Sequence, residues 1–156
     1  MPRFKFRLEA ALKLAERELD NERRRLAVEL EQLRQVKNAA CKAEEEWQGA
    51  IQNQKEAGMH DPENLGRWQA YAVSRLKRLR ELQKELEEQE KRVEAQRVNV
   101  IEAHKNQEKL KKLKEKKKAA FWLKEQHREQ NLLDEAGQII FMRQREEQEY
   151  EVEDEF

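Results

Sequence analysis

The sequence predicts an all-α protein in which two long helices form an antiparallel coiled-coil hairpin, with the second helix longer and overhanging the first. Ala, Leu, Glu, Lys and Arg make up about 61 % of the 156 residues, above the roughly half-share that is typical of coiled coils. Four Gly and two Pro are too few for the turns of a sheet, a sandwich or a Rossmann fold. Charged residues, at 42 %, outnumber the 37 % that are hydrophobic, which favours a narrow apolar seam over a layered core.

The first helix is expected over about residues 4–57, because apolar residues recur there in steps of three and four. Glu22 and Glu44 interrupt this stripe, and consecutive steps of four around Leu26 and Leu30 predict a stutter that relaxes the supercoil. The stripe consists of Phe4, Leu8, Leu12, Ala15, Leu19, Leu26, Leu30, Leu33, Val36, Ala40, Trp47 and Ile51.

A turn is expected over about residues 58–61, followed by a second helix over about residues 62–143. Gly58 can end the first helix in a left-handed conformation, and Asp61 followed by Pro62 can cap and open the next. The apolar stripe of the second helix weakens in its middle, where seam positions carry Gln89, Gln96 and Gln107. Such a seam either loosens the hairpin or sets its register, and the sequence leaves both alternatives open.

The second helix should extend beyond the first. Counted back from the turn, residue 4 should meet about residues 115–118, which leaves an arm of about 25 residues, or roughly 37 Å of helix. An isolated helix should be polar all round, so the large apolar residues of this arm need cover. They are Phe121, Trp122, Leu123, Leu132, Leu133, Ile139, Ile140, Phe141 and Met142. A foreign partner, the N-terminal residues with Phe4 and Phe6, or self-association could each supply this cover.

Charge is distributed unevenly along the second helix, although the chain as a whole has a net charge of zero. Residues 105–128 hold ten Lys or Arg and three Glu, a net charge of +7, and residues 129–156 hold ten acids and two Arg, a net charge of −8. The basic run from Lys105 to Lys118 is either a solvated face or an electrostatic docking surface, and its densest part, Lys111 to Lys118, is called the collar. Residues 146–156 are expected to form an acidic, disordered tail.

The sequence carries no constellation typical of an enzyme, so we expect no catalytic residues, no cofactor, no metal and no small-molecule substrate. It lacks a glycine-rich phosphate loop, GxSxG, HExxH and a Cys/His cluster. The longest apolar run, residues 119–123, is too short to span a membrane, and the N-terminus has no apolar core of a secretory signal. The single cysteine, Cys41, is compatible with a reducing cytoplasm, where we expect the protein to be located.

Four motifs, in this order, make the chain similar to the FliJ family of flagellar export proteins from about residue 4 to residue 145. The opening Phe4 to Glu9 resembles the start of many members, and Arg67-Trp68 with Tyr71 resembles the restart of their second helix. The third is Val93 to Arg97 with Glu102-Ala103 and Lys109 to Lys116, and the fourth is Leu133-Asp134-Glu135.

The resemblance implies a non-enzymatic central-stalk protein of the flagellar type III export apparatus, located peripherally at the inner face of the membrane. Its implied partners are the hexameric export ATPase (FliI-like), the export gate protein (FlhA-like) and export chaperones, and we expect a mostly monomeric rod when it is free. Candidate ATPase-binding residues are Phe4, Phe6, Lys111, Lys112, Lys114, Lys116, Lys117, Lys118, Phe121, Trp122, Leu132 and Leu133. Candidate gate-binding residues are Trp47, Ile51, Trp68 and Tyr71, for which cover of the hairpin end is the alternative role.

Three other functions compete with this one. The first is the equivalent stalk of a virulence-type III secretion system, which has a similar shape and role. The second is a self-associating structural coiled coil without an ATPase partner. Nucleic-acid binding through Lys111 to Lys118 is a minor alternative, because the acidic end opposes the approach of phosphates.

Overall fold

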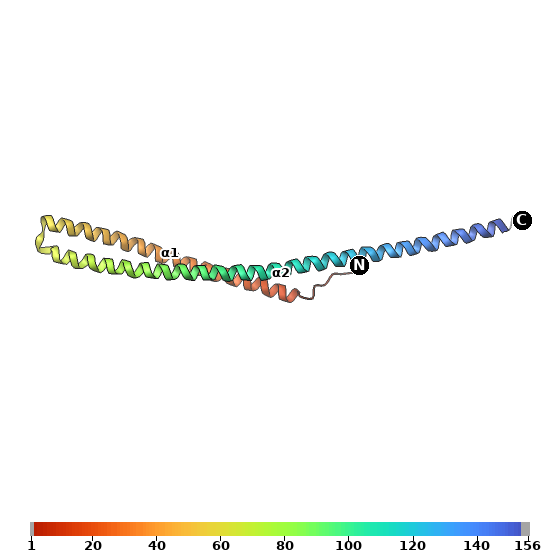
Figure 1. Cartoon of the computed structure of the whole chain (residues 1–156), viewed down its shortest axis with the longest axis horizontal. Coiled ribbons are helices and arrows are strands. Elements are labelled where there is room, and N and C mark those ends of the chain that lie inside the picture. Colours follow the sequence, from red (N-terminus) through yellow and green to blue (C-terminus); the bar gives the residue numbers. More distant parts are fainter. Residues whose placement is uncertain (1, 154–156) are drawn as a thin grey trace. The chain divides into compact units, whose positions relative to one another are not determined.

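The structure is a computed structural model that describes residues 2–153, with side chains described to residue 147. It contains two α-helices joined by a short 3-10 helix (Figure 1). Helix α1 spans Glu9–His60 and has 52 residues, η1 spans Pro62–Asn64, and α2 spans Leu65–Glu153 and has 89 residues. No strand occurs among the described residues, which confirms the all-α prediction. The chain divides into two units, residues 13–107 and residues 1–12 with 108–156, and each is described by itself.

In residues 13–107, buried and half-buried side chains together follow steps of three and four residues on both helices. The buried apolar ones are Ala15, Leu19, Ala43, Ala50 and Ala57 on α1, and Ala72, Leu79, Leu82 and Val93 on α2. The four buried alanines of α1 are spaced by multiples of seven and so occupy the same heptad position, where small side chains allow close packing. Ala43, Leu79 and Leu82 form one cluster, against which Trp47 packs.

Polar contacts in the same unit run in opposite order along the two helices. Glu46 accepts a hydrogen bond from Arg75 at 3.0 Å, Glu29 accepts one from Gln89 at 2.6 Å, and Glu22 accepts one from Gln96. Later residues of α1 therefore meet earlier residues of α2 within this unit.

The predicted stutter at Leu26 and Leu30 is wrong. The half-buried positions continue in regular steps through Leu26, Glu29 and Leu33, whereas Leu30 is 40 % exposed. Glu22, which we expected to interrupt the stripe, is also half-buried on the seam. Glutamate occupies these positions because each carboxylate finds a donor on the facing helix, so its polarity does not exclude it from the seam.

Two Gln–Glu pairs, one heptad apart, occupy the middle of the seam. Nε2 of Gln89 donates both to the main-chain carbonyl of Glu29, at 3.1 Å, and to its carboxylate. Gln96 makes the same two bonds to Glu22, so each pair repeats the geometry of the other. Both amide hydrogens of each glutamine are used in this way, which favours the register-setting role over the loosening one.

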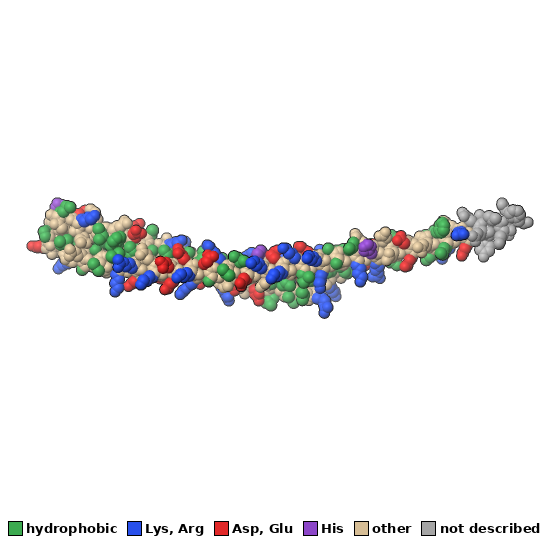
Figure 2. Space-filling model, viewed as in Figure 1, with side chains coloured by type: hydrophobic (Ala, Val, Ile, Leu, Met, Phe, Trp, Pro, Cys, Tyr) green, Lys and Arg blue, Asp and Glu red, His purple; other side chains and the backbone are tan. Residues whose placement is uncertain are grey.

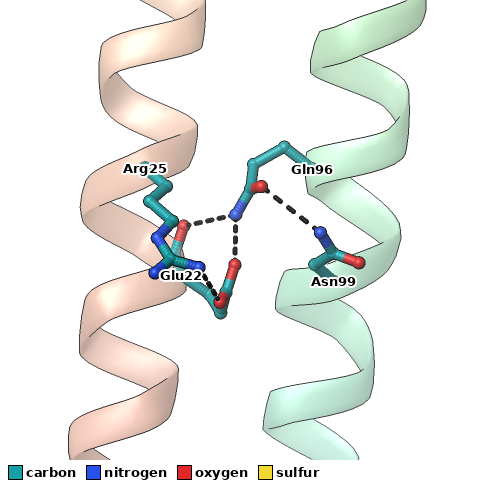
Figure 3. A network of polar contacts seen from close by, with 4 residues as sticks. All are labelled: Glu22, Arg25, Gln96 and Asn99. Carbon is teal, nitrogen blue, oxygen red and sulfur yellow. Dashed lines mark hydrogen bonds and ion pairs between the residues drawn. The ribbon is translucent and has the colours of Figure 1, made fainter.

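Neighbouring side chains extend one of these pairs into a network (Figure 3). Arg25 donates to the second carboxylate oxygen of Glu22 at 2.8 Å, and Asn99 donates to Oε1 of Gln96 at 3.3 Å. The carboxylate of Glu22 thus accepts from both helices, which fixes its position on the seam.

The turn differs from the prediction at Gly58. No described glycine has a positive φ, and α1 continues through Gly58 to His60. The reversal comes from Asp61 and Pro62: Asp61 adopts φ −146° and ψ 69°, because a residue before proline is driven out of the helical region. The side chain of Asp61 makes no cap bond to the backbone and accepts instead from Asn64 Nδ2 at 2.7 Å.

The helix ends near the termini also differ from the predicted bounds. α1 begins at Glu9 rather than near residue 4, after a turn in which the Glu9 N–H donates to the Phe6 carbonyl at 3.2 Å. α2 continues ten residues beyond 143, through residues rich in Glu and Gln without Gly or Pro, which are good helix formers. Most of the segment that we expected to be a disordered tail is therefore helical, and residues 154–156 lie outside the described residues.

The molecular surface is mixed in character. Figure 2 shows Lys and Arg, Asp and Glu, and apolar side chains interspersed over the face in view. Among the described residues, neither helix contains a stretch apolar enough to span a lipid bilayer.

Candidate functional site

The N-terminal segment packs on α2 through aromatic side chains. The rings of Phe4 and Phe121 lie 5.6 Å apart between centroids, and those of Phe121 and Trp122 lie 5.5 Å apart in an edge-on arrangement. Phe6 is buried, with 9 % of its surface exposed. Three of the candidate ATPase-binding residues, Phe4, Phe121 and Trp122, are thus in ring contact, and cover by the N-terminus accounts for part of the apolar arm.

Phe4 contacts α2 beyond the position that we expected. It meets Phe121 rather than residues 115–118, because residues 2–6 are not helical. An extended residue advances by about 3.3 Å, compared with 1.5 Å for a helical one, so the same few residues reach farther along α2.

Lysines 111–118 form the collar that the sequence indicated, but one of them differs from the others. Lys114 is half-buried, and its Nζ lies 2.8 Å from Oε2 of Glu9. This ion pair partly neutralises the charge of Lys114. The other five are exposed. They are Lys111, Lys112, Lys116, Lys117 and Lys118.

The apolar face of α2 beyond this aromatic contact is open. Leu132 and Leu133 are 57 % and 73 % exposed, and Ile139 and Ile140 are similarly exposed. With Ala136, these four side chains occupy positions three, four and seven residues apart, so they share one face of the helix. The two isoleucines complete a stripe of which the candidate set held only the leucines, and the same spacing argument identifies them.

The four candidate gate-binding residues have different environments near the turn. Trp68 and Tyr71 lie edge to face at 5.9 Å, and together with Asp61, Asn64 and Arg67 they line an open groove. Trp47 packs against the buried cluster of α1 and α2, and Ile51 is half-buried. Trp68 and Tyr71 therefore form part of an accessible concave surface.

Arg75 supports this groove, although the candidate set did not include it. Its guanidinium lies 5.1 Å from the Tyr71 ring centroid and pairs with Glu46 at 3.0 Å. A cation over an aromatic ring fixes the ring's orientation as well as stabilising it. Arg75 stands at a regular heptad step between Ala72 and Leu79, and this spacing is the signal that places it at the seam.

The side chains that could take part in metal binding do not gather into one cluster within the described part of the chain. No group of three or more His, Cys, Asp or Glu side chains within it is arranged to hold a metal ion. Cys41 is exposed on α1.

The family model described as Flagellar FliJ protein matches residues 4–146, which is nearly the whole chain. No curated protein and no solved structure matches it.

Proposed function

Because the chain belongs to the FliJ family of flagellar proteins and is a stalk protein of the flagellar export apparatus, we propose that it binds the hexameric export ATPase and links it to the export gate. In this role it has no catalytic activity of its own and regulates the ATPase by contact. We place it at the cytoplasmic face of the membrane, where an export gate protein and export chaperones are its further partners.

The observation that carries the ATPase assignment is the open apolar face of Leu132, Leu133, Ile139 and Ile140. Large apolar side chains that are exposed together indicate a protein contact, and they supply most of the energy of such contacts. The exposed lysines of the collar belong to the same unit and suit a polar rim, which mainly sets orientation and association rate. An apolar centre with a basic rim fits the interior of a protein ring.

The stalk geometry is part of the proposal. A single antiparallel hairpin, with the longer α2 extending past α1, presents one helix to the ring. The opposite order of the contacts in residues 13–107 and the lengths of 52 and 89 residues support this arrangement.

The gate contact is assigned to the groove of Trp68 and Tyr71. Aromatic side chains with a neighbouring arginine are the residue types most enriched at the centres of interfaces. We therefore expect Trp68→Ala and Tyr71→Ala to weaken gate binding with little change in helicity, and Trp47→Ala to lower the stability of the fold. Val73→Ala, an exposed position on the same helix, serves as the control. A loss of helicity in the first two variants supports a packing role instead.

The ATPase assignment is tested with charges placed on and off the apolar face. Leu132→Glu combined with Leu133→Glu should abolish pull-down of the ATPase and stimulation of its turnover. Gln130→Glu with Asn131→Glu adds the same charge beside the face and should change neither. Replacing the five exposed lysines of the collar with Gln should weaken binding mainly at low salt. Wild-type binding and stimulation by the Leu132 and Leu133 variant would show the assignment to be wrong.

A further inference from the structure

One face of α2 carries an apolar pattern that is symmetric about Ala136. Large apolar side chains lie three and four residues before and after this alanine, at Leu132, Leu133, Ile139 and Ile140. Their exposed fractions range from 54 % to 73 %, so nothing in the described part of the chain covers them. A sequence that is symmetric about one residue of a helix can pack on itself when the second helix runs in the opposite direction.

Charged residues at the two ends of this face follow the same symmetry with opposite signs. Glu129 lies seven residues before Ala136 and Arg143 lies seven residues after it, and both side chains are exposed. Seven residues are nearly two turns, so both charges lie close to the centre line of the apolar face.

We propose that a second copy of this chain covers this face, in an antiparallel pair whose two-fold axis passes through Ala136. Leu132 then packs against Ile139 of the second copy, and Leu133 packs against Ile140 of the second copy. Ala136 faces its own counterpart on the axis, where a small side chain lets the two helices approach closely.

The charges select the antiparallel orientation. In the antiparallel pair, Glu129 of each chain faces Arg143 of the other, which gives two attractive contacts in one symmetric interface. A parallel pair places Glu129 against Glu129 and Arg143 against Arg143, and like charges across an interface oppose it. A second copy related by this one two-fold axis thus covers the apolar side chains and also pairs the charged ones.

The pair is weak and reversible. Stable interfaces bury at least about 1,200 Å² of accessible surface, and a single apolar stripe of about four helical turns buries less than this. The monomer that we expect for the free protein is therefore the dilute form, and the pair accumulates as concentration rises. The inference does not rest on the proposed function, because it concerns the chain without any ATPase.

Sedimentation equilibrium of the full chain, over about 5–500 µM, tests the pair. The mean mass should rise from 18.9 kDa toward twice that value. Glu129→Arg and Arg143→Glu should each lower the association constant about fivefold or more, and the double exchange should restore it. Asp134→Arg makes the same charge change on the opposite side of α2 and should have no effect. A mass that stays at 18.9 kDa, or a double exchange no better than its single variants, overturns the proposal.

Oxidative cross-linking tests the position of the axis. In a Cys41→Ser background, Ala136→Cys should form a disulfide-linked dimer, because helices about 8–10 Å apart bring facing Cα atoms within reach of a disulfide. Gln138→Cys, on the opposite side of α2, should cross-link many-fold more slowly. Equal rates at the two positions contradict an axis at Ala136. Both changes are small substitutions at exposed sites, and circular dichroism verifies that helicity is retained.

Discussion

Residues 13–107 and residues 122–147 use α2 in opposite ways. In the first region, Gln89 is buried on the seam and hydrogen-bonded across it. In the second region, Leu133 and Ile140 are more than half exposed. Burial in this protein therefore follows the presence of a facing helix rather than the hydropathy of the side chain.

The comparison assigns different roles to polarity and to apolarity. The polar seam positions contribute little net stability, because each hydrogen bond replaces one to water. In any other register of α1 against α2, however, these buried polar groups would lack hydrogen-bond partners, which is destabilising. The apolar positions from Leu132 to Met142 are more than half exposed, so they contribute little stability within the described chain and are available to a partner. Residues 13–107 specify the register in which α1 packs against α2. Residues 122–147 carry the apolar surface that can supply the energy of binding to a partner.

The largest expected effect contrasts two leucines of α2. Leu82→Ala should lower the free energy of unfolding by about 2–4 kcal/mol, because Leu82 is 5 % exposed and its removal leaves a cavity in the seam. Leu123→Ala should change it by no more than about 0.5 kcal/mol, since Leu123 is 56 % exposed. Urea denaturation followed by circular dichroism measures both. Similar losses for the two variants would mean that residues 122–147 do have apolar cover in the free protein.

The polar pair of Glu22 and Gln96 should show strong coupling. Gln96→Leu should destabilise by about 1–3 kcal/mol, because it leaves the half-buried Glu22 carboxylate without its donor from α2. Adding Glu22→Leu should recover most of this loss, since two apolar residues pack together on a seam. A double-mutant cycle from urea denaturation gives the coupling energy. Additive effects of the two substitutions would contradict the pairing.

The aromatic contact of the N-terminal segment should have a smaller and local effect. Phe4→Ala should remove about 0.5–1.5 kcal/mol of local stability, because the Phe4 and Phe121 rings are in contact. The Glu9 amide, whose N–H bonds to Phe6, should then exchange faster with solvent, by up to about tenfold. Phe141→Ala, at a 65 % exposed position, is the matched control. Unchanged exchange at Glu9 would show that the segment is held without Phe4.

The sequence predicts the helices well because apolar periodicity and the scarcity of Gly and Pro are strong local signals. It places the chain reversal near residue 60 but assigns the wrong residue to it. Gly58 permits a left-handed conformation without requiring one, whereas Pro62 lacks an N–H and restricts Asp61, so the proline decides where α1 ends.

The sequence predicts the seam less well wherever a residue's partner decides its burial. Glu29 and Leu30 differ by one position, and hydropathy selects the leucine, yet Glu29 lies on the seam because Gln89 faces it. Arg75 is missed because hydropathy does not select an arginine, although its heptad spacing places it at the seam, where Tyr71 and Glu46 contact its guanidinium. The roles of the candidate interaction residues and the partners they contact stay predictions, because no local pattern encodes a foreign surface.

The smallest expected effect comes from a surface pair that neither region depends on. On α1, Arg34 donates two hydrogen bonds to the exposed Glu31 carboxylate, and these bonds lower the pKa of Glu31 from its ordinary value of 4.5. A depressed carboxyl pKa stabilises the fold above the unfolded-state pKa, and this contribution is lost as the pH falls through the folded-state pKa. Glu31→Gln should therefore lower the Tm slightly at pH 7 and leave it unchanged near pH 2, where the wild-type carboxyl is also neutral. Glu45→Gln, which neutralises another exposed carboxyl on the same helix, is the control. An equal Tm shift in both variants at pH 7 would contradict a stabilising contribution from the pair of Arg34 and Glu31.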